Sequence, residues 1–451
     1  MNVSVALFTA DLRVHDNPVL RAALDGAPRV VPLFVVDSGI RAAGFVSPNR
    51  AAFLADCLAD LDGALRARGG RLVVRHGDVV AETCRVAAET AAGTVHLAAG
   101  VSGYATTRER GLRAALAADR RELRVHDTSL TTLPAGAVAP AGRDHYAVFT
   151  PYLRRWLAAE PRPVLAAPRV LRVPRVRSER LPDAARLGAT GERSPRLPTG
   201  GEDPARRRLR GWERGGLDGY ADRHDDLAGD ATSRLSPYLH FGCLSATELR
   251  HRAGRRAGPG AAAFVRQLAW RDFHHQVLAA RPDAAWHDYR PRGDRWRRDE
   301  AAVEAWRAGR TGYPLVDAAM RQLREEGWMH NRARLIAASF LTKTLYEDWR
   351  IGARHFLALL VDGDVANNQL NWQWVAGTGT DTRPNRVLNP LTQARRFDPR
   401  GEYVRRWVPE LAGLAGPSAH RPWRAAADVD YPPPIVELTA AAERFHAARR
   451  G

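Results

Sequence analysis

The sequence predicts an α/β protein in which a doubly wound, Rossmann-like parallel sheet comes first and an all-helical region follows. Two observations indicate the sheet: five short apolar runs lie within residues 1–127, and Ala-rich segments with helical periodicity separate them. A third indicates the helical region, because from Pro204 onward apolar residues recur at helical spacing between Gly and Pro stops. We therefore divide the 451 residues into a domain at 1–127, a linker at 128–204 and a helical domain at 205–451.

The expected strands are the runs VSVALF, RVVPLFVV, RLVVR, TVHLAA and LRVHD, and the expected helices between them lie near residues 48–68, 79–91 and 104–118. Ligands of such sheets bind at the carboxyl ends of the strands. The loop after the first strand, TADLRVHDNP, contains neither a G-x-G-x-x-G nor a Walker sequence. An ordinary dinucleotide or nucleoside triphosphate site is therefore not expected there.

The linker contains one segment with helical character, HYAVFTPYLRRW, which predicts a short docked helix. The remainder, residues 160–204, is rich in Pro and Arg and predicts an exposed, partly mobile wrap. Farther along, Asp299 is a suitable N-cap for a helix that Gly309 ends. Pro314 suits the first turn of the next helix, which Gly327 ends.

The charge balance indicates an anionic partner. The chain has 68 basic and 50 acidic residues, a formal net charge of +18, and nucleic acid is the simplest partner for such an excess. Lys343 is the only lysine, so the excess is almost entirely arginine. Abundant Arg, Ala, Gly and Pro together are typical of GC-rich coding, which weakens the inference from charge alone.

Composition also argues against several classes of protein. Cys57, Cys84 and Cys243 are odd in number and far apart, so we expect reduced, buried thiols and no disulfide or zinc framework. The N-terminus lacks a basic region followed by a long apolar run, so no signal peptide is expected. No run of about 18 apolar residues occurs, so no membrane span is expected.

The stretch from Thr311 to Trp407 combines polar side chains with a buried-helix pattern and holds five tryptophans: Trp328, Trp349, Trp372, Trp374 and Trp407. On a helix, Trp372 and Trp374 are two steps of about 100° apart and face nearly opposite ways. One could then face a cavity, although tryptophans at this spacing are more often packing residues. Spacing alone leaves both interpretations open.

The motifs GYPLVDAAMRQL, GWMHNRAR, DGD-x-x-x-N, and WQW followed by TGTD and NP resemble the flavin-binding core of the DNA photolyase/cryptochrome family. The resemblance extends from LFTADLRVHDNP at residues 7–18 to WVPEL at 407–411, and it is greatest to class I photolyases that repair cyclobutane pyrimidine dimers. It implies an N-terminal antenna-chromophore domain and a helical FAD-binding domain. It also implies a deoxyribodipyrimidine photolyase, a carbon–carbon lyase in which light drives an electron from reduced, anionic FAD to a flipped-out dimer; photolyases are themselves a known example of base flipping.

The resemblance further implies the partners and the place of the protein in the cell. We expect it to act on UV-damaged DNA as a cytoplasmic monomer that associates with the nucleoid when bound to DNA. The segment SPNRAAFLADCLADL is more similar to relatives that hold 8-hydroxy-5-deazaflavin as antenna than to those that hold methenyltetrahydrofolate. The folate and an antenna domain that binds nothing both remain alternatives.

Three groups of site residues follow from the resemblance, and no metal ligand is among them. The residues expected at FAD are Tyr220, Thr232, Ser233, Leu235, Ser236, Phe264, Asn331, Arg334, Asp362, Asp364 and Asn368. The residues expected at the lesion or the DNA backbone are Gln267, Trp270, Arg271, Arg332, Leu335, Trp374 and Arg386. The residues expected to take part in electron transfer are Asn368, Gln267, Trp372, Trp349 and Trp296, the last three as a relay.

Some of these assignments also have a chemical reason. The hydroxyls of Thr232, Ser233 and Ser236 precede a helical pattern, where they can bind phosphate or merely cap the helix. The resemblance selects the FAD pyrophosphate. It also implies that Asp362 pairs with Arg334, whereas spacing alone would equally allow a charged loop and helix cap. Asn368 is expected beside flavin N5, to which an amide can donate or from which it can accept.

Three departures from the class I pattern lie near the substrate: Gln267 replaces a glutamate, Leu335 replaces a methionine, and PNRVLNP at 384–390 is one residue short and lacks aromatic residues. Two other functions therefore stay open. One is a cryptochrome-type blue-light receptor without repair, against which the short segment after WVPEL argues. The other is a lyase for (6-4) photoproducts, which Gln267 favours.

Overall fold

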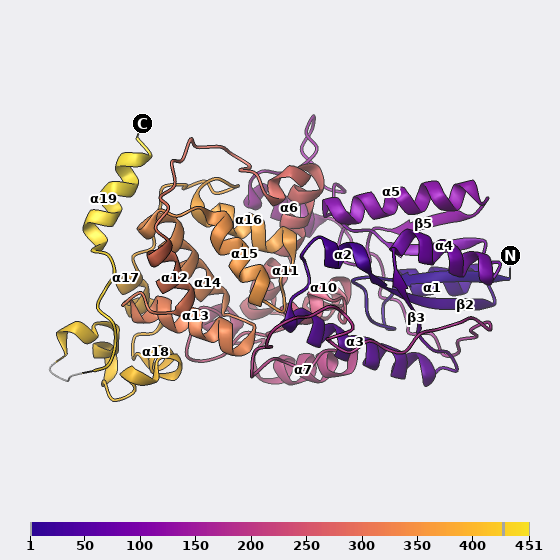
Figure 1. The fold of residues 1–451 in the computed structure, drawn as a ribbon, viewed down its shortest axis with the longest axis horizontal. Helices are drawn as coiled ribbons and strands as arrows, with labels where there is room; N and C mark the ends of the chain where they lie inside the picture. The colour runs from indigo at the N-terminus through magenta and orange to yellow at the C-terminus, as the bar shows by residue number, and fades with distance from the viewer. Residues whose placement is uncertain (1, 426–428, 451) are drawn as a thin grey trace. The chain divides into compact units, whose positions relative to one another are not determined.

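The computed structural model describes residues 2–425 and 429–450, which form two compact units (Figure 1). The first comprises Met1–Arg193, Pro198–Ala221 and Ser233–Pro282; the second comprises Ser194–Leu197, Asp222–Thr232 and Asp283–Gly451. These units group residues by packing, and the first contains helices from the region that the sequence assigned to the helical domain. The expected division at residues 127 and 204 stays a prediction.

The first unit contains the predicted parallel sheet. Its strands are β1 (Val3–Phe8), β2 (Arg29–Asp37), β3 (Val73–Gly77), β4 (Thr94–Ala98) and β5 (Glu122–His126), in the order β3-β2-β1-β4-β5. All four pairings are parallel, and Val5 of β1 pairs with Val31 of β2 and with Val95 of β4. The prediction of a doubly wound α/β sheet is confirmed.

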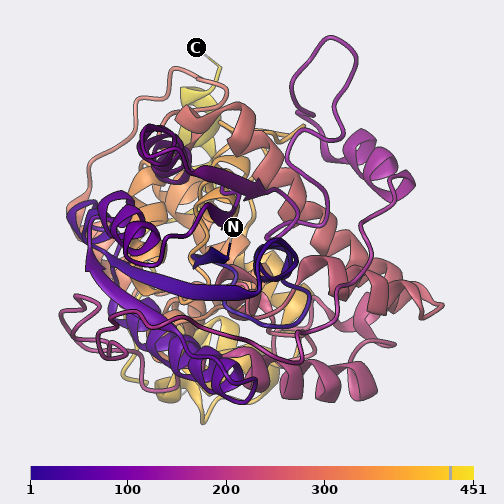
Figure 2. The same ribbon diagram turned by 90° about the vertical axis from the view of Figure 1, so that its right-hand side faces the viewer.

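Helices cover both faces of this sheet (Figure 2). They are α1 (Pro18–Gly26), α3 (Pro48–Arg66), α4 (Val79–Glu89) and α5 (Gly103–Ala118), with the short α2 (Ser38–Ala42) after β2. The chain moves outward from β1 to β3 and then returns to β4, so right-handed crossovers place α1 and α3 on one face and α4 and α5 on the other. The sequence did not predict α1, which Asn17 caps by accepting from the Leu20 N–H.

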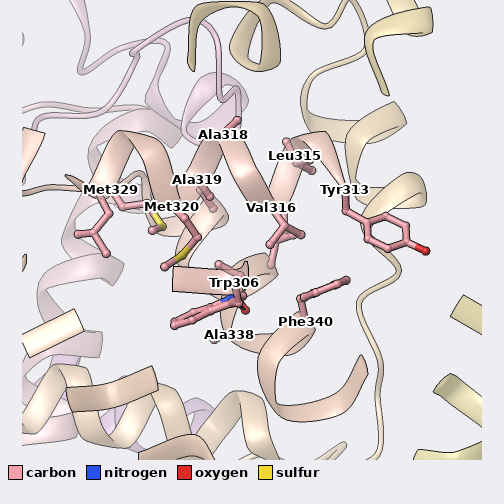
Figure 3. Packing of buried hydrophobic residues seen from close by; sticks show 14 of the residues in the cluster. Trp306, Tyr313, Leu315, Val316, Ala318, Ala319, Met320, Met329, Ala338 and Phe340 are labelled. Atoms are coloured by element: carbon pink, nitrogen blue, oxygen red, sulfur yellow. Dashed lines mark hydrogen bonds between the residues drawn. The ribbon is translucent and has the colours of Figure 1, made fainter. Parts of the chain in front are cut away.

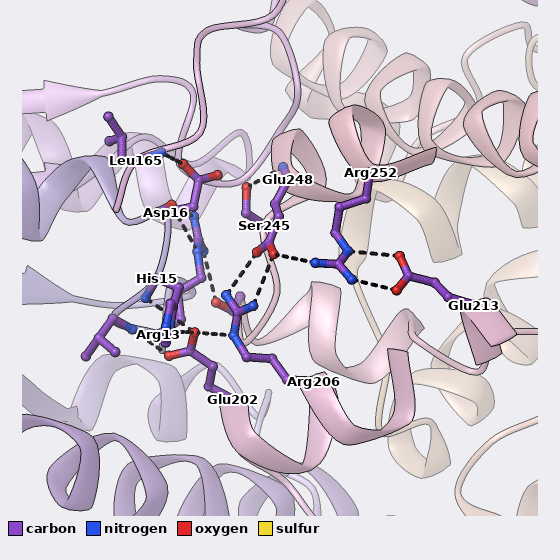
Figure 4. A network of polar contacts seen from close by, with 12 residues as sticks. Arg13, His15, Asp16, Leu165, Glu202, Arg206, Glu213, Ser245, Glu248 and Arg252 are labelled. Atoms are coloured by element: carbon purple, nitrogen blue, oxygen red, sulfur yellow. Dashed lines mark hydrogen bonds and ion pairs between the residues drawn. The ribbon is translucent and has the colours of Figure 1, made fainter. Parts of the chain in front are cut away.

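The first unit also contains α6 (Phe149–Ala158), α7 (Glu202–Gly215), α9 (Ser236–His240), α10 (Ala246–Gly254) and α11 (Pro259–Ala280). Ion pairs and hydrogen bonds join α7 and α10 to each other and to the loop after β1 (Figure 4). Glu202 of α7 accepts from the Val14 N–H at 2.7 Å, and Arg206 bridges Glu202 to Glu248 of α10. This network explains why α7 and α10 belong with the N-terminal residues.

A buried aspartate ties α11 to the linker. Asp272 accepts hydrogen bonds from the backbone N–H groups of Thr132 and Leu133 and from Nε1 of Trp156. Trp156 is fully buried on α6, so the predicted docked helix is present, and it begins at Phe149 within the segment HYAVFTPYLRRW. Burial raises the pKa of Asp272 from its usual value, and the hydrogen bonds and Arg271 oppose that shift.

Residues 160–193 wrap over the sheet region with backbone hydrogen bonds, and their expected partial mobility stays a prediction. The Leu171 N–H donates to the Arg68 carbonyl, the Val30 N–H donates to the Arg172 carbonyl, and the Glu179 N–H donates to the Val74 carbonyl. The segment therefore runs along β2 and β3 as a hydrogen-bonded strap without becoming a strand of the sheet.

The expected burial is confirmed for two of the three cysteines. Cys57 and Cys243 are both buried, and although they are far apart along the chain, their sulfur atoms lie 3.4 Å from each other within the first unit. Burial raises the pKa of the Cys57 thiol, and the neighbouring thiol adds to the shift. Cys84, in contrast, is only partly buried.

The second unit is helical over its described residues. Its longer helices are α12 (Glu300–Ala308), α13 (Pro314–Glu326), α14 (Asn331–Ser339), α15 (Trp349–Leu359), α16 (Val365–Ala376), α17 (Pro390–Phe397), α18 (Glu402–Trp407) and α19 (Leu438–Ala448). It also contains the π-helical segment η2 (Phe340–Leu345) and the 3₁₀-helices η3 (Pro409–Leu411), η4 (Gly416–His420) and η5 (Pro422–Arg424). Two more, α8 (Tyr220–Arg223) and η1 (Pro282–Ala285), lie where the chain passes between the units.

The predicted starts and ends of two helices in the second unit are confirmed. Asp299 caps α12 by accepting from the Ala302 N–H, and Gly309 ends this helix with a φ of 65°. Pro314 begins α13, and Gly327 ends it with a φ of 59°. Between these helices lies a core in which the aromatic ring of Trp306 packs near Val316, Met320 and Ala338 (Figure 3).

None of the helices in the described residues is both long enough and apolar enough to span a bilayer.

Candidate functional site

The second unit contains a pocket that polar and apolar residues line together. The lining residues are Asn331, Arg334, Leu335, Ala338, Phe356, Asp362, Asn367, Asn368, Asn371, Trp372 and Val375. They come from α14, α15 and α16 and from the segment before α16. Six of the residues predicted from the sequence therefore line a single cavity.

The predicted pair of Arg334 and Asp362 is present in this pocket. Arg334 donates from one terminal nitrogen to Oδ2 of Asp362 at 2.8 Å and from Nε to the Met329 carbonyl at 2.9 Å. The Asp362 side chain is 3% exposed, and its other oxygen, Oδ1, has no hydrogen-bond partner among the described residues. An unsatisfied buried carboxylate oxygen is costly, so it marks a place where a ligand can supply a donor.

The two other polar residues of the DGD-x-x-x-N motif have distinct roles. Asp364 is the N-cap of α16 and accepts from the backbone N–H and the side-chain amide of Asn367. Asn368 donates from Nδ2 to the Ala353 carbonyl and to Oε1 of Gln369. Because the amide nitrogen of Asn368 is engaged within the protein, its carbonyl oxygen is the group that it can offer to a ligand.

Trp372 forms an apolar wall of the pocket and is 2% exposed. Its ring meets Phe356 edge to face at 4.8 Å and Trp306 at 6.1 Å between centroids. A Cβ atom on Gly352 would overlap the Trp372 ring, so only glycine permits this approach. Trp374, two residues on, packs partly buried against the core and does not belong to the residues that line the pocket, as expected for opposite directions on one helix.

The other two relay candidates differ in exposure. Trp349 is fully buried, donates from Nε1 to Oδ1 of Asp288 at 2.8 Å, and has the Arg350 guanidinium over its ring. Trp296 is partly buried and lies against Tyr346, with 5.1 Å between ring centroids. This gradient from buried to partly exposed is consistent with a path toward the surface, and the relay itself stays a prediction.

The DNA candidates of the second unit have different surroundings. Arg332 forms a two-point ion pair with Asp225, at 3.1 and 2.7 Å, and lies over the Phe397 ring. Its guanidinium therefore already has an anionic partner. Arg386 is exposed on the loop before α17. Leu335 lines the pocket.

In the first unit, the predicted FAD contacts Tyr220 and Phe264 belong to an aromatic cluster. Phe264 lies 6.1 Å from Tyr220 and 4.6 Å from Trp212, measured between ring centroids. The start of α11 approaches this region closely, because a Cβ atom on Gly260 would overlap the Leu217 carbonyl oxygen. Nearly one turn after Phe264, the side chain of Gln267 is partly exposed on α11.

Two residues of α11 that are expected at the lesion, Trp270 and Arg271, contact other parts of the first unit. The Trp270 ring stacks on Phe149 of α6, with 3.6 Å between centroids and 6° between planes. Arg271 donates to the Leu130 carbonyl at 2.6 Å and to the Leu239 carbonyl at 3.4 Å. Its side chain is only 12% exposed, so in this structure it braces the linker.

The TSRLS segment lies where the chain passes from the second unit to the first, with Thr232 in the second and Ser233, Leu235 and Ser236 in the first. The buried Thr232 hydroxyl has no hydrogen-bond partner in the part of the chain that the structure describes. Ser233 accepts at its carbonyl from Nε of Arg208, and Leu235 is buried. The helix that follows, α9, has only five residues. The phosphate role stays a prediction.

Several pocket residues were not predicted from the sequence. Asn367, Asn371, Phe356 and Val375 line the cavity, although only Asn368 and Trp372 were named on α16. Helical periodicity could have indicated the three on α16, because positions 367, 368, 371, 372 and 375 share one side of a helix. Among the described residues, no group of three or more His, Cys, Asp or Glu side chains could hold a metal ion.

The carboxyl end of the sheet also carries buried charge. Arg50 on α3 is 7% exposed, and burial lowers its pKa to about 10. Arg108 on α5 has a buried Nε that no described residue meets with a hydrogen bond. Asp11, in the loop after β1, is fully buried, and burial raises its pKa. These charges follow β1 and lie on the helices after β2 and β4, where ligands of doubly wound sheets bind.

Comparison with known proteins gives a consistent result. A family model described as DNA photolyase matches residues 4–169, and one described as the FAD binding domain of DNA photolyase matches residues 264–450. The deoxyribodipyrimidine photo-lyase of Streptomyces griseus is 63% identical over 455 residues, covering 100% of this chain and 99% of that one. The solved class III photolyase of Agrobacterium tumefaciens is 33% identical with a TM-score of 0.90, covering 100% and 97% of the two chains. A Synechocystis cryptochrome structure is 30% identical with a TM-score of 0.91, covering 99% of each chain.

Proposed function

The chain belongs to the DNA photolyase family, and on this premise we propose that it repairs cyclobutane pyrimidine dimers in DNA in a light-driven reaction. The observation that carries the proposal is the pocket of the second unit, in which Arg334, Asp362, Asn368 and Trp372 meet. The 63% identity to a deoxyribodipyrimidine photo-lyase over the whole chain supports the same substrate class.

The residues of the pocket fit a flavin. The isoalloxazine ring is flat and apolar with a polar imide edge, and the pocket offers Trp372 and Phe356 as apolar surfaces. Oδ1 of Asp362 can accept a hydrogen bond from a ligand N–H, and the Arg334 guanidinium beside it can donate. When bound, reduced FAD supplies the light absorption and the electron that the repair requires.

The protein's own residues bind and orient the flavin. Asn368 presents its carbonyl oxygen because its amide is held by Ala353 and Gln369, and a carbonyl oxygen matches a flavin N5 that carries hydrogen. This favours the reduced form of the cofactor. The hydroxyls of the TSRLS segment are assigned to the pyrophosphate. Trp372, Trp349 and Trp296 are the proposed path by which the flavin is reduced from the surface.

For the substrate, we assign Trp270 and Trp374 as the aromatic walls and Gln267 as the polar contact to the flipped dimer. Base–aromatic stacking is worth roughly 1–3 kcal/mol per base, enough to offset part of the cost of unstacking. Arg332 and Arg386 are the proposed contacts to the DNA backbone. We propose that the enzyme works as a monomer, which light scattering of the DNA-bound protein would test.

The antenna site is proposed at the carboxyl end of the sheet. The buried Arg50 side chain and the buried Nε of Arg108 favour a ligand that carries negative charge. 8-Hydroxy-5-deazaflavin has an acidic hydroxyl and agrees with the sequence of α3. Absorption spectroscopy of the chromophore released from the purified protein would distinguish it from methenyltetrahydrofolate.

The deciding experiment is illumination of the purified, reduced protein with an oligonucleotide that contains one cyclobutane dimer. Ultraviolet absorbance should recover as the pyrimidine double bonds re-form, and an oligonucleotide with a (6-4) photoproduct should remain unrepaired. Repair of the (6-4) lesion alone would overturn the substrate assignment. Flavin photochemistry without repair of either lesion would support a blue-light receptor. The similarity to the Synechocystis cryptochrome structure is the reason to test for this function.

A further inference from the structure

Lys343 occupies an unusual position. It is the sole lysine among 68 basic residues, and it is 2% exposed. It lies in η2, a π-helical segment that continues directly from α14, the helix that carries the pocket residues Asn331 and Arg334. π-helical turns are rare and occur frequently at functional sites. A buried ammonium costs several kcal/mol unless protein groups replace its water.

The groups that replace this water belong to one loop. Nζ of Lys343 donates to the Pro384 carbonyl at 2.8 Å and to the Arg386 carbonyl at 2.6 Å. One turn earlier, Oγ of Ser339 accepts from the Leu388 N–H at 3.1 Å. The element formed by α14 and η2 therefore holds the backbone of residues 384–388 by side-chain hydrogen bonds. Arg386 lies within this loop and Arg383 directly precedes it, and both side chains are exposed.

We propose that Lys343 is a positioning residue for DNA, which holds the backbone of residues 384–388 so that Arg383 and Arg386 are presented to the phosphates of the damaged strand. The proposal rests on the proposed function, because it takes DNA as the partner of this loop. Lys343 is buried and acts only through the loop. Fixing the backbone beforehand lowers the entropic cost of binding the two arginines.

The choice of lysine at this position follows from its shape. Elsewhere the chain uses arginine for every basic residue. A guanidinium is planar and carries five donors in a fixed fork, whereas an ammonium is compact and can direct its donors at two carbonyls that converge on one nitrogen. We therefore expect Lys343→Arg to fail as a replacement.

Helix α19 also packs against η2. The Phe445 ring lies 5.6 Å from Nζ of Lys343, and Arg444 donates to the Thr344 carbonyl at 3.0 Å. Just beyond the helix, Arg449 pairs with Asp294 at 2.8 Å. Nζ of Lys343 therefore lies near an aromatic ring and two carbonyls, and the charges of Asp381, Asp294, Arg449 and Arg386 act on it.

These surroundings make the contact sensitive to pH. Burial lowers the pKa of Lys343 to about 7, with Arg449 and Arg386 adding to the shift and Asp381 and Asp294 opposing it. The ammonium is present below this pKa, so as the pH rises through about 7 the loop carbonyls lose a charged donor and affinity for DNA should fall. Nearby phosphates favour the ammonium, so DNA should raise the pKa.

The first test compares Lys343→Met, Arg386→Ala and the double variant in binding to a dimer-containing duplex at several salt concentrations. Lys343→Met should bind about tenfold more weakly, and its salt dependence should fall by roughly 0.9 log unit per decade of salt for each phosphate that the variant no longer binds. The double variant should bind more tightly than the product of the two single losses predicts, because Lys343→Met already removes most of the contribution of Arg386 and adds only the loss at Arg383. Unchanged absorbance of the bound flavin shows that the fold is retained.

Three outcomes would separate the hypotheses. If the wild-type protein binds and repairs the duplex while Lys343→Met equals it in affinity and salt dependence, only the role of Lys343 is overturned. Independent, multiplying losses in the double variant would overturn it as well. If the wild-type protein does not bind damaged duplex at all, the proposed function fails and this inference fails with it.

A second measurement avoids the variant altogether. Wild-type protein labelled with lysine that carries ¹³C at Cε gives one lysine signal in an NMR spectrum, because the chain has one lysine. The chemical shift should titrate with a midpoint near 7, and dimer-containing duplex should move this midpoint upward. A midpoint that DNA leaves unchanged would overturn the proposal even if Lys343→Met does not fold.

Discussion

Phe149 and Trp270 stack face to face, with ring centroids 3.6 Å apart and planes within 6° of parallel. Phe149 is the first residue of α6 in the linker, and Trp270 lies in the middle of α11. One face of Trp270 is therefore already covered, so a pyrimidine can use only the other face. The linker helix thus sets the orientation of a residue that the sequence places at the lesion.

This stack predicts that Phe149→Ala weakens binding of the dimer. Aromatic pairs contribute about 0.5–1.5 kcal/mol beyond the area that they bury, so we expect a roughly fivefold loss of affinity. Phe149→Tyr keeps a flat ring and should bind almost normally. Fluorescence anisotropy with a dimer-containing oligonucleotide measures both. Equal affinity of wild type and Phe149→Ala would show that Trp270 keeps its orientation without the stack.

Trp372 should be the first donor in the tryptophan relay, because it lines the flavin pocket and is 2% exposed. Trp372→Phe keeps most of the packing against Phe356 but removes the oxidisable indole. We expect photoreduction of oxidised FAD to be blocked and repair by chemically reduced enzyme to stay largely intact. Trp306→Phe is the matched control, since its ring lies 6.1 Å from Trp372 but was not predicted to take part. Photoreduction at the wild-type rate in Trp372→Phe would rule out the assignment.

Arg332 is predicted to contact a DNA phosphate. In the structure its guanidinium pairs with Asp225, so this carboxylate would compete with the phosphate for Arg332. Arg332→Ala should lower the salt dependence of duplex binding by about one phosphate, or roughly 0.9 log unit per decade of salt. Asp225→Asn weakens the ion pair and should strengthen binding. Isothermal titration at several salt concentrations checks both variants. A slope that Arg332→Ala leaves unchanged would mean that Arg332 remains with Asp225 when DNA binds.

Gln267 should still support repair of cyclobutane dimers. Glutamine keeps the carbonyl acceptor of the usual glutamate and adds an NH₂ donor. A hydrogen bond to a charged group contributes about 1.5–3 kcal/mol, more than a neutral pair, so its removal should affect the reaction more than ground-state binding. Gln267→Leu should therefore reduce the yield per absorbed photon more than it reduces affinity, and Gln267→Glu should retain activity. A Leu variant with the wild-type yield would make the side chain a packing residue.

Local patterns in the amino-acid sequence were enough to assign the fold class, the five strands and several of the helices. Apolar runs of strand length separated by helical patterns are local signals, and so are the caps Asp299 and Gly309, because they depend on neighbouring backbone groups. The resemblance of the motifs from GYPLVDAAMRQL to WVPEL to a known flavin-binding core likewise implied that Arg334 and Asp362 pair. These inferences needed no knowledge of how distant segments pack.

Which of these side chains are already engaged became visible only in the folded chain. Arg332 pairs with Asp225, Arg271 donates to the Leu130 carbonyl, and Trp270 stacks on Phe149. Each partner is far away along the chain. Folding also brings Cys57 to Cys243 and directs the only lysine to the carbonyls of a later loop. Such contacts depend on packing between remote segments, and no local pattern of residues specifies them.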